Sequence, residues 1–265
     1  MIKPMLAHKV GKKDIDFYDK VFLQPKLDGV RCVFTKDGAF SRTGKQFKNV
    51  AHLEHDLADF FRRHPFTILD GELYNHKLKH DFEKIISLVR KTKPTEDDRL
   101  DAQHLVQYHV YDTVASFVNY EARYDWLVSN LPIARSMTLI INPIVRSMTE
   151  AKEMHEAYLN QGYEGSMLRL NKPYEQKRSY NLQKFKDFHD TEATIIDYVT
   201  GKGKRVGTLG KFIMRDDEGV EFGCPPGKGY NYEDLADMLV DVNDYIGKRA
   251  TFTYFQRTKA GSYRH

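Results

Sequence analysis

The sequence has little cysteine, little tryptophan and no long apolar run. Its 265 residues include two cysteines, Cys32 and Cys224, and one tryptophan. Two thiols exclude a framework of several disulfides and a four-cysteine zinc site, and they suit a reducing compartment. The first residues, "MIKPMLAHKVGKK", lack an apolar run of signal-peptide length, and no stretch could span a bilayer. We therefore expect a soluble intracellular protein, in the cytoplasm or nucleus, without membrane contact.

Neither sign of charge dominates the composition. Lysine and arginine total 41 and aspartate and glutamate 37, a formal net charge of +4. This small excess permits a nucleic-acid partner without requiring one, because a local basic face matters more than the total. Apolar residues make up 41%, which is typical of globular proteins and not of disordered tails. The length fits one large domain or two of ordinary size.

Strand and helix signals are mixed as far as about residue 189. The helical periodicity is clearest at 50–64 and 147–162, where Ser147 and Glu150 have capping-box spacing and Gly162 closes the pattern. After residue 190, four or five short strands lie between glycine-rich turns, with one helix at 232–242. This spacing predicts a small oligonucleotide-binding (OB) barrel. Further strands are predicted at 21–26, 30–42, 66–74, 105–114, 139–145, 164–170 and 181–187, and further helices at 81–91 and 120–131.

The segment "LQPKLDGVRC" places charged residues in a stretch otherwise suited to a buried strand. Lys26, Asp28, Gly29 and Arg31 form the pattern K-x-D-G-x-R. Such a match arises by chance in roughly one chain in a few hundred, and a solvated hairpin end would also explain it. Four further elements follow in order: "SRTGK" at 41–45, "DGE" at 70–72, "YEG" at 163–165 and "KFK" at 184–186.

This ordered set resembles the covalent nucleotidyltransferases, and most closely the minimal viral or phage type of ATP-dependent DNA ligase. "KLDGVR" and "SRTGK" favour DNA ligases over mRNA-capping enzymes and RNA ligases. The resemblance runs from "KPMLA" at 3–7 to "FTYFQR" at 252–257, nearly the whole chain. It implies an α+β fold: an adenylation domain at 1–189 with ATP-grasp-like antiparallel sheets and helices, then an OB-fold β-barrel at 190–265.

The resemblance makes Lys26 the nucleophile that attacks the α-phosphorus of ATP and holds AMP in a phosphoramide bond. AMP then passes to the 5′-phosphate of a nick in duplex DNA, and the 3′-hydroxyl displaces it. A free lysine has a pKa near 10.4, so such a site needs nearby cations or a metal ion to favour the neutral amine. Lys184 and Lys186, two apart on a strand, face one way and suit this task. By themselves they also fit a solvated surface pair.

The resemblance gives Glu72 and Glu164 contacts with Mg²⁺ or ribose, and carboxylates with phosphate oxygens are ordinary Mg²⁺ ligands. Asp28 and Arg31 belong to the catalytic motif. Arg31 and Arg42 are assigned to phosphate and sugar at the nick, since guanidinium groups bind phosphate with two parallel hydrogen bonds. The alternatives are an exposed strand end for Glu72 and a surface position for Arg42.

The resemblance also supplies a base slot and a DNA-contacting surface. Tyr111 aligns with the aromatic that stacks on adenine, although strand packing would equally explain it. Gln24 lies where family members contact the adenine edge. A glycine-rich basic hairpin at 201–211 is suited to DNA phosphates, or is simply a solvated charge run. The residues expected to contact nucleic acid are Arg42, Lys45, Lys202, Lys204 and Arg205.

Two alternatives stay open: an RNA ligase or capping-type nucleotidyltransferase, and a non-catalytic nucleic-acid-binding relative. An NAD⁺-dependent ligase is disfavoured because that branch carries a cysteine zinc site. The chain ends at "GSYRH", where the family's basic strand that orients the outer ATP phosphates would begin. Either the tail was removed, or the chain charges its lysine poorly or through another group, so we expect lysine charging to be affected more than the later steps. The expected cofactors are ATP and Mg²⁺, the expected partner is nicked duplex DNA, and the expected state is a monomer.

Overall fold

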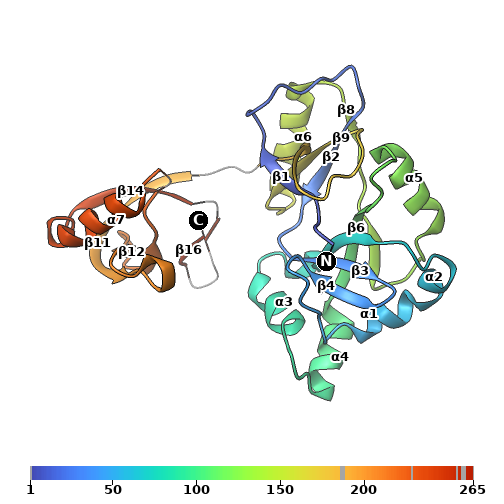
Figure 1. The fold of residues 1–265 in the computed structure, drawn as a ribbon, viewed down its shortest axis with the longest axis horizontal. Coiled ribbons are helices and arrows are strands. Elements are labelled where there is room, and N and C mark those ends of the chain that lie inside the picture. The colour runs from blue at the N-terminus through green and yellow to red at the C-terminus, as the bar shows by residue number, and fades with distance from the viewer. Residues whose placement is uncertain (1, 186–188, 228, 255, 258–260, 265) are drawn as a thin grey trace. The chain divides into compact units, whose positions relative to one another are not determined.

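The computed structural model describes residues 2–185, 189–227, 229–254, 256–257 and 261–264. The chain divides into two compact units, Met1–Lys186 and Asp187–His265 (Figure 1). Among the described residues, no helix has the length and apolar character needed to cross a membrane. Each unit has its own sheets and its own buried residues, so each is described by itself.

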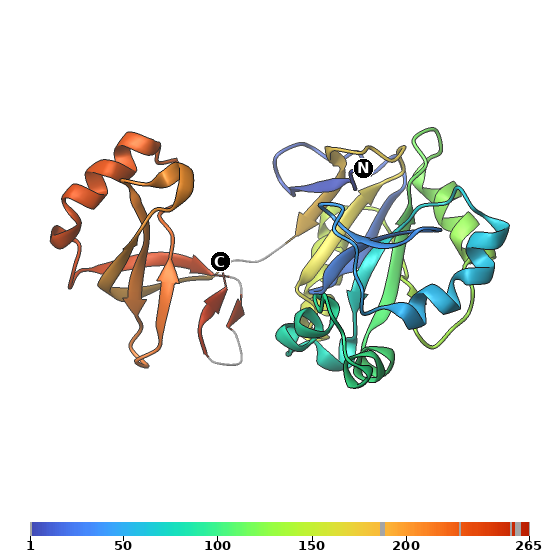
Figure 2. The same ribbon diagram turned by 60° about the horizontal axis from the view of Figure 1, so that its bottom comes forward.

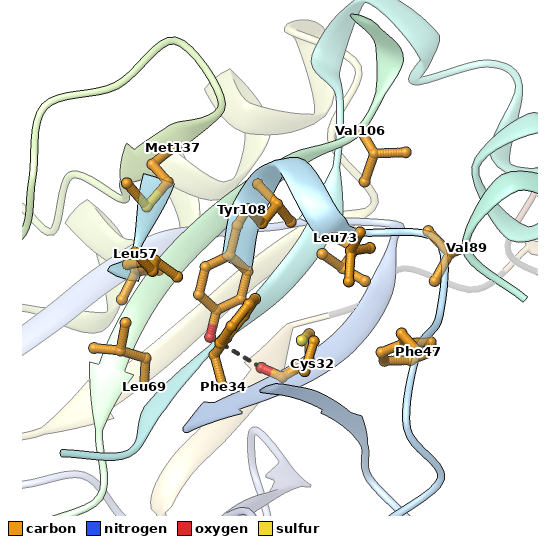
Figure 3. Close-up of a cluster of buried hydrophobic side chains, with 14 of the residues drawn as sticks. Cys32, Phe34, Phe47, Leu57, Leu69, Leu73, Val89, Val106, Tyr108 and Met137 are labelled. Carbon is orange, nitrogen blue, oxygen red and sulfur yellow. Dashed lines mark hydrogen bonds between the residues drawn. The ribbon is translucent and has the colours of Figure 1, made fainter. Parts of the chain in front are cut away.

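One five-stranded sheet of the first unit has the order β4-β3-β5-β6-β7. Helices α1 to α4 pack their apolar side chains against it and form the largest buried cluster. Tyr108 lies in this cluster and donates its hydroxyl to the Cys32 carbonyl over 3.1 Å (Figure 3). The bounds are β3 Val30–Thr35, β4 Gly38–Ser41, α1 Ala51–Asp56, α2 Ala58–Arg63, β5 Leu69–Tyr74, η1 His76–Leu78, α3 Phe82–Val89, α4 Glu96–Leu105, β6 Gln107–Thr113, α5 Tyr120–Asn130 and β7 Met137–Leu139.

The other sheet of this unit has the order β1-β10-β9-β2-β8. Helix α6 buries Ala151 against this sheet, where the contacting residues are Val21 and Leu23 of β2 and Leu168 of β9. Ser147 caps this helix by accepting a hydrogen bond from the Glu150 amide, which is one half of the predicted capping box. The Glu150 carboxylate accepts from the Arg146 amide instead of the Ser147 amide, so the other half is wrong. The bounds are β1 Leu6–Lys9, β2 Val21–Lys26, β8 Ile144–Val145, α6 Met148–Asn160, β9 Gly165–Leu170 and β10 Arg178–Phe185.

The expectation of wholly antiparallel sheets is wrong at two strand pairs. Strand β1 runs parallel to β10, and β6 runs parallel to β7. A parallel pair requires a long connection, and both pairs have one: the segment between β6 and β7 contains α5, and most of the first unit separates β1 from β10. The predicted helix at 50–64 is also divided at Leu57 into α1 and α2. Helix α4 was not predicted, because it buries only Ala102 and so lacks an apolar stripe.

The second unit contains a four-stranded antiparallel sheet of order β13-β12-β11-β14, shown with α7 in Figure 2. Alternate residues of β11, Ala193 and Ile195, face the buried cluster with Met214, Phe222 and Phe252. The bounds are β11 His189–Thr200, η2 Gly203–Arg205, β12 Leu209–Arg215, β13 Glu221–Cys224, α7 Tyr232–Val240, η3 Val242–Asp244, β14 Arg249–Tyr254, β15 Gln256–Arg257 and β16 Tyr263–Arg264.

Candidate active site

Strand register places Lys26 directly beside the "YEG" segment. The last residue of β2, Lys26, is paired with Gly165 at the start of β9. The Glu164 amide donates to the Lys26 carbonyl over 3.1 Å, and the Lys26 Nζ donates to the Glu164 carboxylate. The Glu164 side chain is 6% exposed. The lysine amine is therefore held by a buried carboxylate and does not extend into bulk water.

A cavity of about 270 Å³ opens beside this ion pair and is lined by residues of both sheets of the first unit. Its polar lining combines cations, one carboxylate, one amide and one tyrosine, and its walls include Leu27, Met167 and Leu182. An apolar slot with a few converging polar groups is typical of a small-molecule site. The predicted site residues that line it are Gln24, Lys26, Arg31, Arg42, Glu72, Tyr111 and Lys184.

Other predicted residues lie outside this lining. Asp28 is partly buried and Lys45 is exposed, and neither lines the cavity. Lys186 lies outside the described residues. Three basic residues, Lys202, Lys204 and Arg205, belong to the second unit and are exposed at and beside η2. The roles assigned to all of these stay predictions.

A larger groove of about 570 Å³ lies at α1, α4 and the start of β6. Its lining includes His52, His55 and His104 but no lysine, and its one carboxylate is Asp56. Among the described residues, no group of three or more histidine, cysteine, aspartate and glutamate side chains is arranged to hold a metal ion. The chemistry of nucleotide transfer therefore favours the smaller cavity.

The Arg31 side chain is fixed by an ion pair with Asp70, a residue outside the K-x-D-G-x-R motif. Its Nε and Nη2 donate to the two oxygens of Asp70 over 2.9 and 2.5 Å. Asp70 is fully buried and also accepts from the Tyr174 hydroxyl over 2.7 Å. The guanidinium lies 5.5 Å from the Tyr111 ring centre. The ion pair occupies the Nε and Nη2 of Arg31, and the residue also lines the cavity.

The glycines of the motifs are required by close backbone approach. A Cβ on Gly29 would lie 2.5 Å from the Leu73 carbonyl oxygen and 2.7 Å from the Glu72 Cγ. Gly165 has φ of +151°, and a Cβ there would lie 2.5 Å from the Phe185 carbonyl oxygen. Any side chain at these positions would push the strands apart. The glycines thus let Lys26 and Glu72 line one cavity, while Glu164 lies outside its lining and contacts Lys26.

The electrostatics of the cavity differ from those of a solvated surface. Burial raises the pKa of Glu72 to about 8, against the opposing charges of Lys26 and Arg31. Burial, and then the positive charge of Lys26, lowers the pKa of Lys184. Both shifts favour the neutral forms, because charge is costly where water is excluded. A ligand that brings anionic oxygens and a cation would restore the charged forms.

We expect Glu72→Gln to remove a pH dependence of stability. Because burial raises the pKa of Glu72 in the folded chain, its favourable contribution is complete below pH 4.5 and is lost as pH rises through about 8. The free energy of unfolding of the wild type should fall relative to the variant by up to about 1.4 kcal/mol per pH unit in this window. Urea unfolding at several pH values measures the difference, and parallel profiles for the two proteins would contradict it.

Residues 4–186 match the model of the ATP-dependent DNA ligase domain. The chain belongs to this family. The family predicted from the motifs is therefore confirmed. The DNA ligase of Haemophilus influenzae is 27% identical over 261 residues, covering 97% of this chain and 87% of that protein. The DNA ligase of African swine fever virus (strain Badajoz 1971 Vero-adapted) is 26% identical over 230 residues, covering 79% of this chain. The chain spans about half the length of the African swine fever virus ligases it matches, 52% for this strain.

Solved structures show the same ligase fold. A Lig E DNA ligase described as binding DNA with a minimal scaffold superimposes with a TM-score of 0.81 at 25% identity, covering 100% of this chain and 96% of that one. Chlorella virus DNA ligase–adenylate superimposes with a TM-score of 0.54 at 24% identity, covering 99% and 95%. The second similarity shows the fold alone. The named relatives are DNA ligases, which supports this interpretation over the RNA-ligase and capping alternatives.

Proposed function

We propose that the chain is an ATP-dependent DNA ligase that seals nicks in duplex DNA through a lysyl-AMP intermediate. The observation that carries the proposal is the Lys26 amine at the wall of the cavity, paired with Glu164 and close to Glu72 and Lys184. Nucleophile, carboxylates and a second cation are the groups that nucleotide transfer to an amine requires.

In the first step the Lys26 Nζ attacks the α-phosphorus of ATP. The new bond joins nitrogen to phosphorus, and the bond from phosphorus to the pyrophosphate oxygen breaks. Glu164 already accepts a hydrogen bond from Nζ, so it is placed to take the proton that the amine must lose. Lys184 and Arg31 would neutralise the phosphate oxygens as charge develops on them.

Mg²⁺ would bind to Glu72 and Glu164 together with phosphate oxygens, and it would supply charge neutralisation. This donor set suits Mg²⁺, which is usually bound by one or two carboxylates plus substrate phosphates. The adenine would occupy the slot between Tyr111 and the apolar wall, with Gln24 at its edge.

In the second and third steps AMP passes to the 5′-phosphate of the nick, and the 3′-hydroxyl then displaces AMP. Arg42 is exposed at the rim of the cavity and is proposed to hold the 5′-phosphate. Lys45, Lys202, Lys204 and Arg205 are proposed to contact backbone phosphates, and Lys186 to act beside Lys184.

We also propose that residues 190–265 form an OB-type domain after an adenylation domain at 1–189. The first strand of the second unit, β11, pairs with both the second and the fourth, and α7 lies between the third and the fourth. This connectivity is compatible with a Greek-key barrel. The grooved faces of such barrels bind oligonucleotides, which fits a DNA substrate.

The test is incubation with α-labelled ATP and Mg²⁺ followed by a denaturing gel. We expect label on the chain, its release when nicked duplex DNA is added, and a joined strand as product. Label from GTP in preference to ATP would favour a capping-type enzyme. Label that is discharged to nicked RNA but not to nicked DNA would favour an RNA ligase. Failure to take up label would contradict the proposal.

A further inference from the structure

The groove of about 570 Å³ in the first unit is separate from the cavity at Lys26. Its lining comes from α1, α4, the start of β6 and the residues just before β7, and none of these residues lines the cavity. Pockets for small molecules measure about 300–1,000 Å³, so the size suits one such ligand. We call it the arginine groove, after Arg99 and Arg135 in its lining.

The two arginines give this groove an uncompensated positive charge. Arg99 and Arg135 are exposed, and within the described part of the chain neither guanidinium forms an ion pair. The one carboxylate of the lining, Asp56, already accepts hydrogen bonds from the Ser136 hydroxyl and, over 3.3 Å, from the His55 Nδ1. Guanidinium groups bind phosphate with parallel hydrogen bonds, and one phosphate has enough oxygens to accept from both arginines.

The acidic residues of α4 do not cancel this charge. The helix carries four carboxylates, and none of them lines the groove. Two of them, Asp98 and Asp101, pair with Lys91 and Lys84 over 3.0 Å each. The groove therefore favours an anion although it lies beside an acidic helix.

Two histidines present acceptor atoms to the groove. The His104 Nδ1 faces the Leu100 carbonyl over 2.7 Å. The His52 Nε2 faces the Val106 carbonyl over 2.9 Å. A carbonyl only accepts, so each of these nitrogens carries a proton, and the other nitrogen of a neutral ring is an acceptor. Burial lowers the pKa of His52, which favours its neutral form.

Asn49 adds an acceptor without a partner. Its Nδ2 donates to the carbonyls of Leu88 and Asp98 over 3.1 and 3.0 Å, which fixes the orientation of the amide. The residue lines the groove and is 1% exposed, and its Oδ1 has no hydrogen-bond partner among the described residues. An unsatisfied buried acceptor is unfavourable, so a donor that a ligand brings to Asn49 would be stabilising.

We infer that the arginine groove binds a phosphate monoester that carries hydroxyl groups, such as a sugar phosphate. The phosphate oxygens accept from Arg99 and Arg135. The hydroxyl groups donate to the ring nitrogens of His104 and His52 and to the Asn49 oxygen. A DNA backbone fits less well, because its phosphodiesters and deoxyribose rings offer no hydroxyl donor between the strand ends. This inference does not depend on the proposed ligase activity.

The test is a set of NMR titrations of the full chain with ribose 5-phosphate, inorganic phosphate and ribose. We expect a dissociation constant of about 1 mM or lower for ribose 5-phosphate, in keeping with its size. Inorganic phosphate should bind about tenfold more weakly, because it lacks the sugar hydroxyls. Ribose has no anion and should not bind measurably.

Variants of the lining separate phosphate recognition from hydroxyl recognition. Arg99→Gln and Arg135→Gln should each weaken ribose 5-phosphate by about tenfold, since each loses hydrogen bonds to a charged group. His104→Phe should weaken ribose 5-phosphate by about threefold and leave inorganic phosphate unchanged, because it removes only an acceptor. Equal weakening of both compounds in His104→Phe would contradict the hydroxyl contact. The unchanged amide signals of the second unit and of α6 show that each variant is folded.

Two arginines outside the groove serve as matched controls. Arg146→Gln changes an exposed arginine between β8 and α6 and should bind ribose 5-phosphate as the wild type does. Arg42→Gln, at the rim of the cavity beside Lys26, should also retain binding. Loss in Arg42→Gln with retention in Arg99→Gln and Arg135→Gln would place the phosphate in that cavity and overturn the inference. Absence of binding up to about 10 mM ribose 5-phosphate would overturn it as well.

A strand of RNA carries phosphates and hydroxyls too, so its titration identifies the source of the phosphate. We expect a short single-stranded RNA to bind the groove no more tightly than ribose 5-phosphate. Tighter binding of the RNA, lost in Arg99→Gln, would overturn the assignment to a free monoester.

Discussion

The Lys26→Ala variant should take up no label from α-labelled ATP. The loss in charging rate should be about a thousandfold or more, because the variant lacks the atom that forms the bond to phosphorus. Lys184, the other described lysine that lines the cavity, lies on a separate strand, β10, so it does not occupy the position from which Lys26 contacts Glu164. The measurement is the rate of protein labelling on a denaturing gel under single-turnover conditions.

Two controls separate lost chemistry from lost folding. Lys36→Ala removes an exposed lysine in the turn between β3 and β4 and should be charged at the wild-type rate. A nick that already carries AMP on its 5′-phosphate needs no lysine nucleophile, so Lys26→Ala should still join it measurably. Label on the alanine variant would show that another residue is the nucleophile.

The largest effect on stability is expected at Asp112. This fully buried carboxylate accepts from the Arg123 Nε and Nη2 over 2.7 and 3.0 Å and from the Arg169 Nη1. Asp112→Asn would leave two buried guanidinium groups without a compensating charge. Removing one partner of a buried ion pair typically costs about 3–5 kcal/mol, so we expect a loss of this order in the free energy of unfolding.

The single tryptophan makes this measurement specific to the first unit. Trp126 lies in α5 and packs against the large buried cluster, so its fluorescence during urea unfolding reports on that unit. The matched control is Asp59→Asn, which breaks an exposed pair with Arg62 and should change stability by less than about 1 kcal/mol. Equal effects of the two variants would contradict the role given to Asp112.

Helices and strands with a regular spacing of apolar residues could be predicted from the sequence. Elements whose stability depends on contacts with distant parts of the chain could not. The α6 pattern of apolar residues and its Ser147 cap were visible in the sequence. Helix α4 buries a single residue and so has no apolar stripe, and its Thr95 capping box was its one signal in the sequence. The parallel pairing of β1 with β10 was missed, since the two strands are separated by almost the whole first unit.

The residues at the cavity also fall into two groups, those that short sequence patterns indicate and those that only the fold brings together. Lys26, Glu72 and Lys184 could be found from short patterns, because their chemistry demands particular side chains at fixed spacing. The partners of Arg31, Arg169 and Gln24 could not be found in this way. Asp70 lies inside the "DGE" pattern, but nothing in that pattern pairs it with Arg31, and Asp112 and Asn142 carry no pattern at all.

By itself the sequence determined the family, because its ordered motifs resemble those of ATP-dependent DNA ligases and the family model matches residues 4–186. Only the tertiary structure decided how the polar groups are turned. Gln24 meets Asn142 and Arg169 across separations of 118 and 145 residues, and the direction of those hydrogen bonds depends on which donor faces which acceptor once β2 and β9 have paired and the segment before β8 has packed beside them.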